Sequence, residues 1–408
     1  MFVGIDWASE EHEVFVSKDD GGRADGFRFA HTQQGFDELV RRLGRHGEPA
    51  DVPVAIERPD GRLVDRLLEA GHPVFPVKTN AIKAWRESEV VSGAKSDAGD
   101  AEVIADYLRI RRHRLRALDP FSDATKALRA VVRARTDLVE QRVAAANQLT
   151  ATLDAFWPGA KAMFSDITCN IALTFLETYP TPAAAAPLGE GRMAAFLKKH
   201  GYTGQRSATE LVERLRAAPA GVIAGNTASA QGDVVLAMVR VIRALNQSIK
   251  DLDRSLNARL DEHPDAAIFT SLPRSGRINA AQMLAEWGDS RQAYDSPGAI
   301  AALSGAAPVT KRSGKHHVVS FRWACNKRLR NAFATFADNS RHASPWAADV
   351  YARARARGHD HPHAIRILAR AWIRIIWRCW IDQVPYDPTR HGAARAFAER
   401  DLATGAAA

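Results

Sequence analysis

The sequence predicts an α/β domain at the N-terminus, then long helices, then a mainly α-helical C-terminal region. Short β-type runs alternate with helical ones over residues 1–118. Two long helical stripes fall within residues 119–264, and compact helical patterns follow over residues 265–385. Residues 386–408 are polar and rich in alanine, which predicts a loosely ordered tail. A chain of 408 residues is long enough for two or three such domains.

The N-terminal region contains its strands and helices in a definite order. Three β-type runs, FVGIDWA, HEVFVSKD and FRFAHT, come first, and the helical run GFDELVRRLG follows and ends at a glycine. The buried-type strand VPVAIERPDG, the helix RLVDRLLEAG, the strand PVFPVK and a helix from Asn80 come next. Three meandering strands followed by alternating helices and strands are typical of a ribonuclease-H-like α/β domain. In such a sheet the first and fourth strands are neighbours.

Two long helical stripes separate the N-terminal and C-terminal regions. The first lies within residues 122–157 and comprises Val139, Val143, Ala146, Leu149, Leu153 and Phe156. The second has the spacing of a coiled-coil seam and comprises Val235, Met238, Ile242, Leu245, Ile249, Leu252 and Leu256. This seam packs either within the chain or between copies of it, which leaves a homodimer or homotetramer open. Residues 157–230 predict several short helices and no function.

The composition favours a nucleic-acid partner. The net charge is +9 and the isoelectric point is about 9.6, with basic clusters at 108–118, 327–330 and 351–358. Neutralising phosphates releases counterions and drives most non-specific binding to nucleic acid. No apolar run approaches the roughly 20 residues of a membrane span, and the N-terminus does not resemble a signal peptide. We therefore expect a cytoplasmic protein.

The cysteines predict neither a disulfide framework nor a zinc site. Cys169, Cys325 and Cys379 lie far apart in the sequence with no CxxC spacing. We expect them to be core thiols.

Four acidic residues stand out by their positions. Asp6 lies in the first strand between apolar neighbours, where an unpaired charge facing the core would be costly. Glu57 ends the strand VAIE, and Asp97 and Asp100 open the helix in SDAGDAEVIADYL. If the first and fourth strands are neighbours, Asp6 meets Glu57, and a helix across them adds the other two carboxylates. Clustered carboxylates are the hard oxygen ligands that Mg²⁺ or Mn²⁺ prefers.

Each acid also has a purely structural interpretation. The two helix aspartates offset the partial positive charge of the helix N-terminus, with Ser96 as the cap. Asp6 caps a turn at the end of its strand, and Glu57 pairs with the neighbouring Arg58. The joint occurrence of the four acids in this order favours the metal site.

The segment TSLPRSGRINAAQMLAEWGD predicts a helix, a tight turn and a second helix. This arrangement resembles a helix-hairpin-helix element, whose turn amides bind a phosphate. The turn residues Arg274, Ser275 and Gly276 are therefore candidates for binding nucleic acid.

The stretches GIDWAS, AIERPDG, KSDAGDAEVIA and LSGAAPVTKRSGK occur in this order along the chain. Together they resemble the insertion-sequence-110 family of transposases, DEDD-type enzymes related to site-specific DNA invertases. The resemblance implies a RuvC-like domain in which Asp6, Glu57, Asp97 and Asp100 bind catalytic metal. It also implies a C-terminal transposase domain whose serine before a glycine, Ser313, forms a covalent phosphoserine with DNA.

The same resemblance implies two further properties that composition and spacing do not indicate. The first is a structured guide RNA, encoded by the element, that pairs with donor and target DNA. The second is an active site shared between subunits, which would require an oligomer.

The surroundings of Ser313 are basic. Lys311, Arg312 and Lys315 could hold phosphates there, or they could form a solvated basic loop. Ser304, in ALSGAAP, also precedes a glycine and is the competing serine. We favour Ser313, because Ser304 fits the turn before the family motif.

The segment after this serine contains two further candidates for contact with DNA or RNA. Asn326 and Arg330 match the family pattern in ACNKRLR. Cys325 stands where the family commonly has a glycine, which leaves the geometry of this loop open.

Three functions are compatible with the sequence. The first is a metal-dependent DNA recombinase with a serine nucleophile. The second is a hydrolytic RuvC-like nuclease or Holliday-junction resolvase, which needs the four acids but not Ser313. The third is a non-catalytic nucleic-acid scaffold. The presence of the acids and the serine together favours the first.

Overall fold

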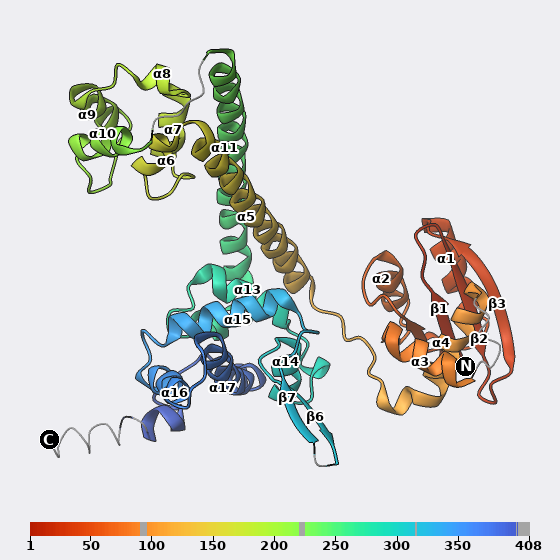
Figure 1. Ribbon diagram of the computed structural model, residues 1–408. Coiled ribbons are helices and arrows are strands. Elements are labelled where there is room, and N and C mark those ends of the chain that lie inside the picture. Colours follow the sequence, from red (N-terminus) through yellow and green to blue (C-terminus); the bar gives the residue numbers. More distant parts are fainter. Residues whose placement is uncertain (90–95, 220–224, 315, 397, 399–408) are drawn as a thin grey trace. The chain divides into compact units, whose positions relative to one another are not determined.

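The computed structural model describes residues 1–89, 96–219, 225–314, 316–396 and 398. The chain divides into two compact units, and each is described by itself (Figure 1). The N-terminal unit comprises Met1–Ser122 and Ser290–Asp295, and the C-terminal unit comprises Asp123–Asp289 and Ser296–Ala408. Within the described residues, no helix is both long and apolar enough to cross a lipid bilayer.

A five-stranded mixed sheet forms the centre of the N-terminal unit. Its strands are β1 (Phe2–Asp6), β2 (Glu11–Ser17), β3 (Arg23–Ala30), β4 (Val54–Ile56) and β5 (Val74–Pro76), in the order β3-β2-β1-β4-β5. The first three strands are antiparallel, whereas β4 runs parallel to β1, and β5 runs parallel to β4. Ile5 pairs with Ile56, so the prediction that the first and fourth strands are neighbours is confirmed.

Helices cover both faces of this sheet. They are α1 (Gln33–Leu43), α2 (Arg62–Glu69), α3 (Thr79–Glu89) and α4 (Asp97–Arg111). Because side chains alternate along a strand, Val54 and Ile56 of β4 join the apolar cluster under α1 and α2. Ala55 joins the opposite cluster, under α3 and α4.

The contact between α4 and β1 depends on Gly4. A Cβ atom at this position would collide with the carbonyl oxygen of Ala101 and the backbone nitrogen of Ala105 in α4. Both alanines are fully buried, so small residues on both elements allow the helix to lie directly on the strand. This close approach holds α4 across the strand that ends at Asp6.

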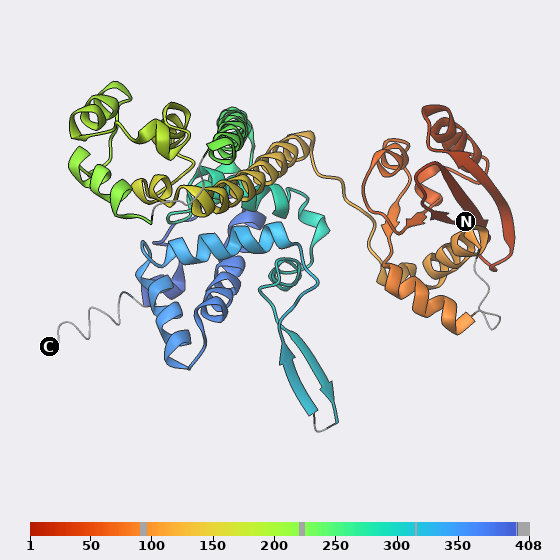
Figure 2. The same ribbon diagram turned by 45° about the horizontal axis from the view of Figure 1, so that its top comes forward.

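The described part of the C-terminal unit is helical apart from one β-hairpin. Its helices are α5 (Asp123–Phe156), α6 (Pro158–Met163), α7 (Asn170–Thr178), α8 (Pro182–Ala185), α9 (Glu190–Lys199), α10 (Ala208–Ala217), α11 (Gly225–Glu262), α12 (Ala266–Thr270), α13 (Arg277–Trp287), α14 (Pro297–Leu303), α15 (Lys327–Ser340), α16 (Pro345–Ala356) and α17 (His361–Asp382). The hairpin consists of β6 (Val309–Ser313) and β7 (His316–Ser320). It extends away from the helices of its own unit (Figure 2).

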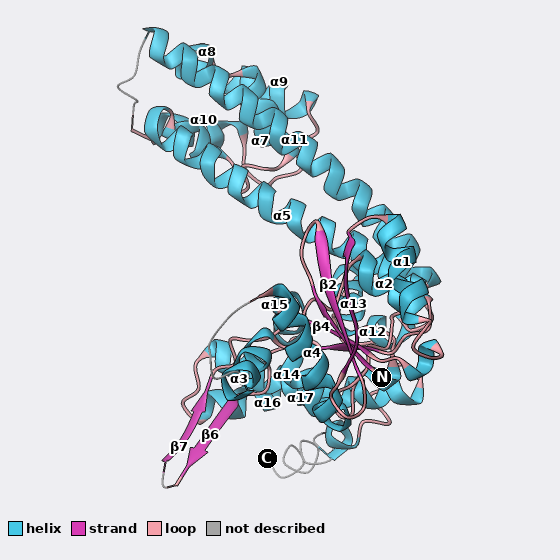
Figure 3. Cartoon of the chain, turned by 90° about the vertical axis from the view of Figure 1, so that its right-hand side faces the viewer, coloured by secondary structure: helices cyan, strands magenta, loops and turns pink. Residues whose placement is uncertain are grey.

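The long helices α5 and α11 lie side by side (Figure 3). The buried residues of the predicted seam on α11 are Val235, Met238, Ile242, Ile249 and Leu256. The seam therefore packs within the chain, mainly against α5, and its first part, at Val235, Met238 and Ile242, shares an apolar cluster with residues of α7. On α5 the predicted stripe is buried at Leu149, Leu153 and Phe156, whereas Val143 is 52% exposed.

Aromatic side chains hold the C-terminal helices together. The ring of Trp287, on α13, lies 5.9 Å from that of Phe333 on α15 and 5.7 Å from that of Trp380 on α17. The start of the predicted tail also packs here, because the ring of Tyr386 lies 5.4 Å from that of Trp372. His391 contacts the Trp346 ring at 4.5 Å. The described residues at the start of the tail therefore belong to the helical body, since aromatic contacts anchor them.

Candidate functional site

The ends of two neighbouring strands and one helix bring the four predicted acids together. Asp6 is the last residue of β1, and Glu57 directly follows β4, its parallel neighbour. Asp97 and Asp100 lie in the first turn of α4, three residues apart and hence on one face. Ser96 caps this helix, since its hydroxyl accepts a hydrogen bond from the Gly99 N–H at 3.1 Å.

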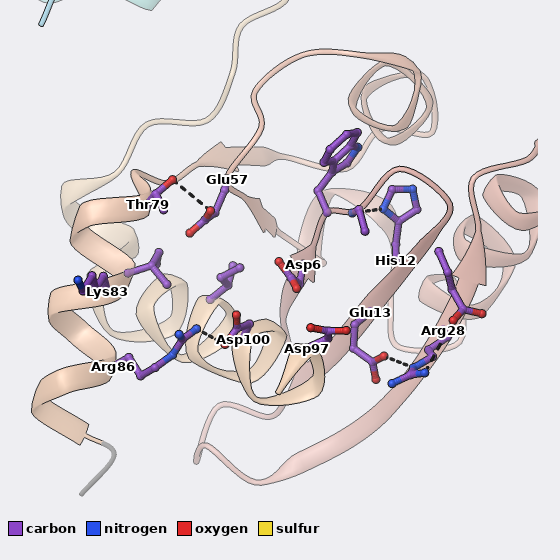
Figure 4. A pocket seen from close by; sticks show the side chains of 15 residues that line it. Asp6, His12, Glu13, Arg28, Glu57, Thr79, Lys83, Arg86, Asp97 and Asp100 are labelled. Atoms are coloured by element: carbon purple, nitrogen blue, oxygen red, sulfur yellow. Dashed lines mark hydrogen bonds and ion pairs between the residues drawn. The ribbon is translucent and has the colours of Figure 1, made fainter. Parts of the chain in front are cut away.

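All four carboxylates line one cavity of about 750 Å³ in the N-terminal unit (Figure 4). Thr79 donates a hydrogen bond to Glu57 at 3.1 Å, and Arg86 forms an ion pair with Asp100. Arg58 pairs with Asp60 at 3.0 Å, so it has a partner other than Glu57. The cavity thus collects acidic side chains together with cations from α3.

The donor set of this cavity fits a hard divalent cation, because all four candidates offer carboxylate oxygens. Among the described residues, no group of three acidic, histidine or cysteine side chains is arranged so as to hold one ion. Arg86 and Asp100 are both largely buried and paired with each other. Binding a cation at Asp100 therefore requires that Arg86 release this carboxylate and that the acids turn toward a common point.

A pair of histidines, of which His12 is buried, supports the loop that follows Asp6. His12 is fully buried on β2, and its Nδ1 accepts a hydrogen bond from the Ala8 N–H at 3.3 Å. Its Nε2 lies 2.8 Å from Nδ1 of His31. Since Nδ1 of His12 accepts, its proton lies on Nε2 and is donated to His31. Burial, with a smaller contribution from His31, lowers the pKa of His12 to about 4, so the ring is neutral near pH 7.

Ser313 lies at the tip of the hairpin in the C-terminal unit. It is the last residue of β6 and is exposed, and Gly314 follows it with a φ of +52° that suits a tight turn. Lys311 and Arg312 precede it on the same strand and are also exposed. Lys315 lies outside the described residues. The hairpin therefore presents a free hydroxyl beside cationic side chains.

The competing serine is in a different environment. Ser304 is 1% exposed and ends α14, where its hydroxyl donates to the Ala301 carbonyl at 3.3 Å. A hydroxyl enclosed in this way has no access to a macromolecular substrate. The structure thus favours Ser313 over Ser304 as the exposed nucleophile candidate.

Comparisons with known proteins agree with the motif order. A family model for DEDD transposases of the IS110 type, described as "Transposase", matches residues 3–158. A second model, described as "Transposase IS116/IS110/IS902 family", matches residues 266–352. The chain is 33% identical over 403 residues to the "Mini-circle putative transposase for IS117" of Streptomyces coelicolor, covering 96% of each chain. The chain belongs to the IS110/IS116 family of transposases.

Other relatives in this family also match along most of their length. The "Insertion element IS900 uncharacterized 42 kDa protein" of Mycobacterium paratuberculosis is 29% identical, over 97% of this chain and 99% of the relative. The "Insertion element IS116 uncharacterized 44.8 kDa protein" of Streptomyces clavuligerus is 28% identical, over 95% and 96%. Membership in a transposase family makes DNA a partner of this protein.

The predicted helix-hairpin-helix turn of this transposase has an unusual backbone. Arg274 has a φ of +54° and Gly276 a φ of +64°, and α13 begins immediately after this turn. Ser275 is 3% exposed and therefore lies inside the turn. Such a turn leaves the first N–H groups of α13 without intrahelical acceptors, as phosphate binding requires.

Two other predicted nucleic-acid contacts have partners within the chain. Asn326 caps α15 by accepting from the Leu329 N–H at 3.1 Å, and it donates to Glu286 at 2.7 Å. The guanidinium of Arg330 lies 5.3 Å from the centre of the Phe321 ring. These contacts give both residues a structural role, and their contact with nucleic acid stays a prediction.

The loop that contains Cys325 has a specific packing. A Cβ atom at Gly305 would lie 2.9 Å from Sγ of Cys325, so the thiol occupies the space that the glycine leaves. Gly305 also has a φ of +70°, which favours glycine there. The larger residue at 325 is thus accommodated by the glycine opposite.

Sequence reasoning missed Arg86 and His12. Neither residue belongs to a motif, and both reach the cavity only through tertiary packing. The only signal for His12 is its place in an alternating strand, at a position that faces the core.

Proposed function

We propose that this transposase cleaves and rejoins DNA through a covalent phosphoserine at Ser313, assisted by Mg²⁺ or Mn²⁺ at its four acids. The observation that carries the proposal is the contrast between the two serines. Ser313 is exposed beside Lys311 and Arg312, whereas Ser304 is buried and bonded to its own helix. Asp6, Glu57, Asp97 and Asp100 line a single cavity, which supports a site for phosphodiester chemistry.

The strand order of the N-terminal sheet supports a RuvC-like interpretation. Three antiparallel strands followed by two parallel strands, in the order β3-β2-β1-β4-β5, place the ends of β1 and β4 side by side. The acids lie at this edge, where polar side chains from neighbouring parallel strands converge. Fold and donor set thus support the same class of enzyme.

The chemical step is a transfer of the phosphodiester to serine. The Ser313 Oγ attacks the scissile phosphorus and gives up its proton to a base or to solvent. The bond from phosphorus to one deoxyribose oxygen breaks as the Oγ–P bond forms, and that oxygen takes up a proton and leaves as a hydroxyl. A deoxyribose hydroxyl of another strand then attacks the same phosphorus and releases the serine. One bond forms for each bond broken, so strand exchange needs no ATP.

The residues of the site have separate roles in this step. Asp6, Glu57, Asp97 and Asp100 would hold the cation, which when bound supplies positive charge that stabilises the transition state. Lys311 and Arg312 would hold phosphates next to the serine. The acids and the serine lie in different units, so the reaction requires them to meet, within one chain or between two copies.

The family resemblance extends this proposal to the partners. We propose that donor and target DNA bind together with a structured guide RNA encoded by the element. We further propose that the active form is a homodimer or homotetramer in the cytoplasm. The helix-hairpin-helix turn at Arg274, Ser275 and Gly276 would bind a phosphate of one of these strands.

Incubation with end-labelled DNA carrying the element's junction, together with its flanking RNA, tests this function. A covalent protein–DNA adduct that survives denaturing electrophoresis is expected, with a dependence on Mg²⁺ or Mn²⁺. Ser313→Ala should abolish the adduct, whereas the matched control Ser304→Ala should retain it. Free nicked ends that persist in Ser313→Ala would instead show a hydrolytic nuclease or resolvase. Binding without cleavage under all conditions would show a scaffold.

A further inference from the structure

A basic groove of about 510 Å³ lies in the C-terminal unit, between α17 and the segment that follows β7. Arg322, Arg366, Arg370 and Arg374 line it, together with His363. No carboxylate belongs to its described lining, and among the described residues none of these four arginines forms an ion pair with a carboxylate. Arg322 donates to the backbone carbonyls of Ala307 and Pro308. The groove is thus a concentration of positive charge with no carboxylate in its described lining.

The spacing along α17 explains how the groove forms. His363, Arg366, Arg370 and Arg374 are three or four residues apart and therefore lie on one face of the helix. The opposite face is buried and includes Trp372. The arginines are one helical turn apart, about 5.4 Å, which makes a row of cations along one strip of surface.

Two arginines outside the groove, one on α17 and one on α16, do have carboxylate partners. Arg378, one turn further along α17, pairs with Asp382 at 2.6 Å, and Arg353 on α16 pairs with Asp349 at 2.7 Å. The absence of such partners in the groove therefore does not follow from a general lack of acids on these helices. A bound anion would supply the missing negative charge.

Aromatic rings stand at the edge of the same groove. Phe321 lines it, and the guanidinium of Arg366 lies 4.9 Å from the centre of this ring. Trp323 meets the Phe321 ring edge to face at 4.8 Å and is 78% exposed. An exposed indole beside a row of arginines offers a face on which a nucleobase can stack.

We propose that this groove binds an unpaired segment of a nucleic-acid strand, with phosphates on Arg366, Arg370 and Arg374 and a base stacked on Trp323. The row of cations matches the row of charges on a strand backbone. The aromatic side chain selects an unpaired strand, because bases within a duplex already stack on their neighbours. The inference rests on the proposed function only in assuming a nucleic-acid partner, and it uses neither Ser313 nor the four acids.

The test measures binding by fluorescence anisotropy with the full-length protein. The probes are a labelled single-stranded DNA of mixed sequence, the RNA of the same sequence and the DNA duplex. Trp323→Ala should weaken single-strand binding about tenfold through loss of stacking and leave duplex binding unchanged. The double variant Arg370→Gln/Arg374→Gln should weaken it as well, and the slope of log K against log salt should fall by about 1.4.

Matched controls separate this site from a general effect of charge. The double variant Arg355→Gln/Arg357→Gln removes two arginines from α16 and its end, outside the groove, which among the described residues form no ion pair with a carboxylate either. It should leave single-strand binding nearly unchanged. The proposal would be overturned if both double variants lost the same affinity for single strands, or if Trp323→Ala bound single strands as tightly as the parent. The single-stranded probe, DNA or RNA, that loses more affinity in Trp323→Ala is the ligand of the groove. If the parent protein binds single strands in this way but forms no covalent adduct with junction DNA, the proposed chemistry is refuted and this inference stands.

Discussion

At the scale of single residues, the acid cavity contains its own competing cation. Arg86 forms an ion pair with Asp100, and both side chains are largely buried. A positively charged guanidinium beside a carboxylate occupies the place that a divalent cation needs and raises the local positive potential. We therefore expect a cation that binds at Asp100 to compete with the Arg86–Asp100 pair.

Replacing Arg86 should lower the Mg²⁺ concentration that the acid cavity requires. In Arg86→Met the Mg²⁺ concentration that gives half-maximal DNA cleavage should fall about fivefold, which corresponds to roughly 1 kcal/mol. Cleavage assays over a Mg²⁺ titration measure this. Lys83→Met is the matched control. Lys83 lines the same cavity, but its ammonium pairs at 4.0 Å with Glu87, which is not one of the four acids. A higher Mg²⁺ requirement in Arg86→Met than in the parent would contradict the competition.

His12 acts on the cavity through the backbone. It fixes the Ala8 N–H, two residues beyond Asp6, and it touches none of the four acids by a described hydrogen bond. His12 is therefore a positioning residue. In His12→Asn the amide oxygen can replace Nδ1 as the acceptor, whereas in His12→Phe nothing can. Cleavage should fall about tenfold in His12→Phe and substantially less in His12→Asn, with duplex binding unchanged in both.

The same histidine gives the fold a pH dependence of known sign. Its pKa is about 4 in the folded protein against 6.5 when unfolded, so the unfolded state binds more protons between these values. The free energy of unfolding should therefore fall as the pH is lowered from 6.5 to 4. Denaturant titrations at several pH values should show that the free energy of unfolding falls less in His12→Asn than in the parent over this pH range. The exposed His113→Asn should behave as the parent does, and an identical pH profile in all three proteins would contradict the assignment.

At the scale of elements, a glycine decides where α4, the helix that carries Asp97 and Asp100, lies. Gly4→Ala places a Cβ atom against backbone atoms of α4, which cannot move aside as a side chain can. We expect at least about 3 kcal/mol of destabilisation of the N-terminal unit and loss of cleavage. Gly191→Ala on α9 meets no atom within 4 Å and should change the stability by less than about 1 kcal/mol. Denaturation followed by circular dichroism compares them, and equal stabilities would refute this role for Gly4.

A buried acid connects three helices of the C-terminal unit. Glu286 on α13 is 1% exposed and pairs with Arg133 of α5 at 2.7 Å, while Asn326 at the start of α15 donates to it at 2.7 Å. Burial by itself would raise the pKa of Glu286, but the hydrogen bonds and charge of these partners outweigh it and leave the pKa below 4.5. The carboxylate is therefore ionised while it is buried.

Neutralising this acid should loosen the three helices. Glu286→Gln is expected to lose about 2–3 kcal/mol at pH 7, because its amide group cannot accept from both partners. Since the pKa is depressed on folding, the contribution is present above pH 4.5 and is lost as the pH falls below it. Urea titrations at pH 7 and pH 4 measure both effects. The exposed Glu213→Gln serves as control, and a loss no larger than in this control would argue against the network.

Elements whose signal is local could be predicted from the sequence, whereas contacts between distant elements could not. The alternation in VGIDWA and VAIE predicted two buried strands, and the sheet places them side by side. The stripe on α5 was predicted through Val143, but this residue is 52% exposed, because the position of α11 decides which face is covered. Leu128 and Val132, near the start of α5 and outside the predicted stripe, are also buried.

The candidate site shows the same limit. The acids could be chosen because strand ends and a helix start are readable in sequence. The cation that pairs with Asp100 comes from α3, which has no motif, and the segment 90–95 between α3 and α4 lies outside the described residues. The basic groove was equally hidden, because an amphipathic helix with arginines on one face is typical of many solvated surfaces.

At the scale of the whole molecule, the candidate site residues are divided between two units. The acids belong to the N-terminal unit and Ser313 to the C-terminal unit. Membership in the IS110/IS116 transposase family makes both units parts of one enzyme for DNA transposition. We propose that the serine forms the covalent bond to DNA while the acids support the reaction.

The most direct measurement identifies the residue that carries the DNA phosphate. The protein is trapped on labelled junction DNA with Mg²⁺ and flanking RNA, digested with protease and nuclease, and the modified peptide is sequenced by mass spectrometry. We expect a single phosphorylated residue, Ser313, and no modified peptide when Asp6→Asn is used. A phosphate on Ser304 or on any other residue, or cleavage by the parent without a modified peptide, would contradict this proposal.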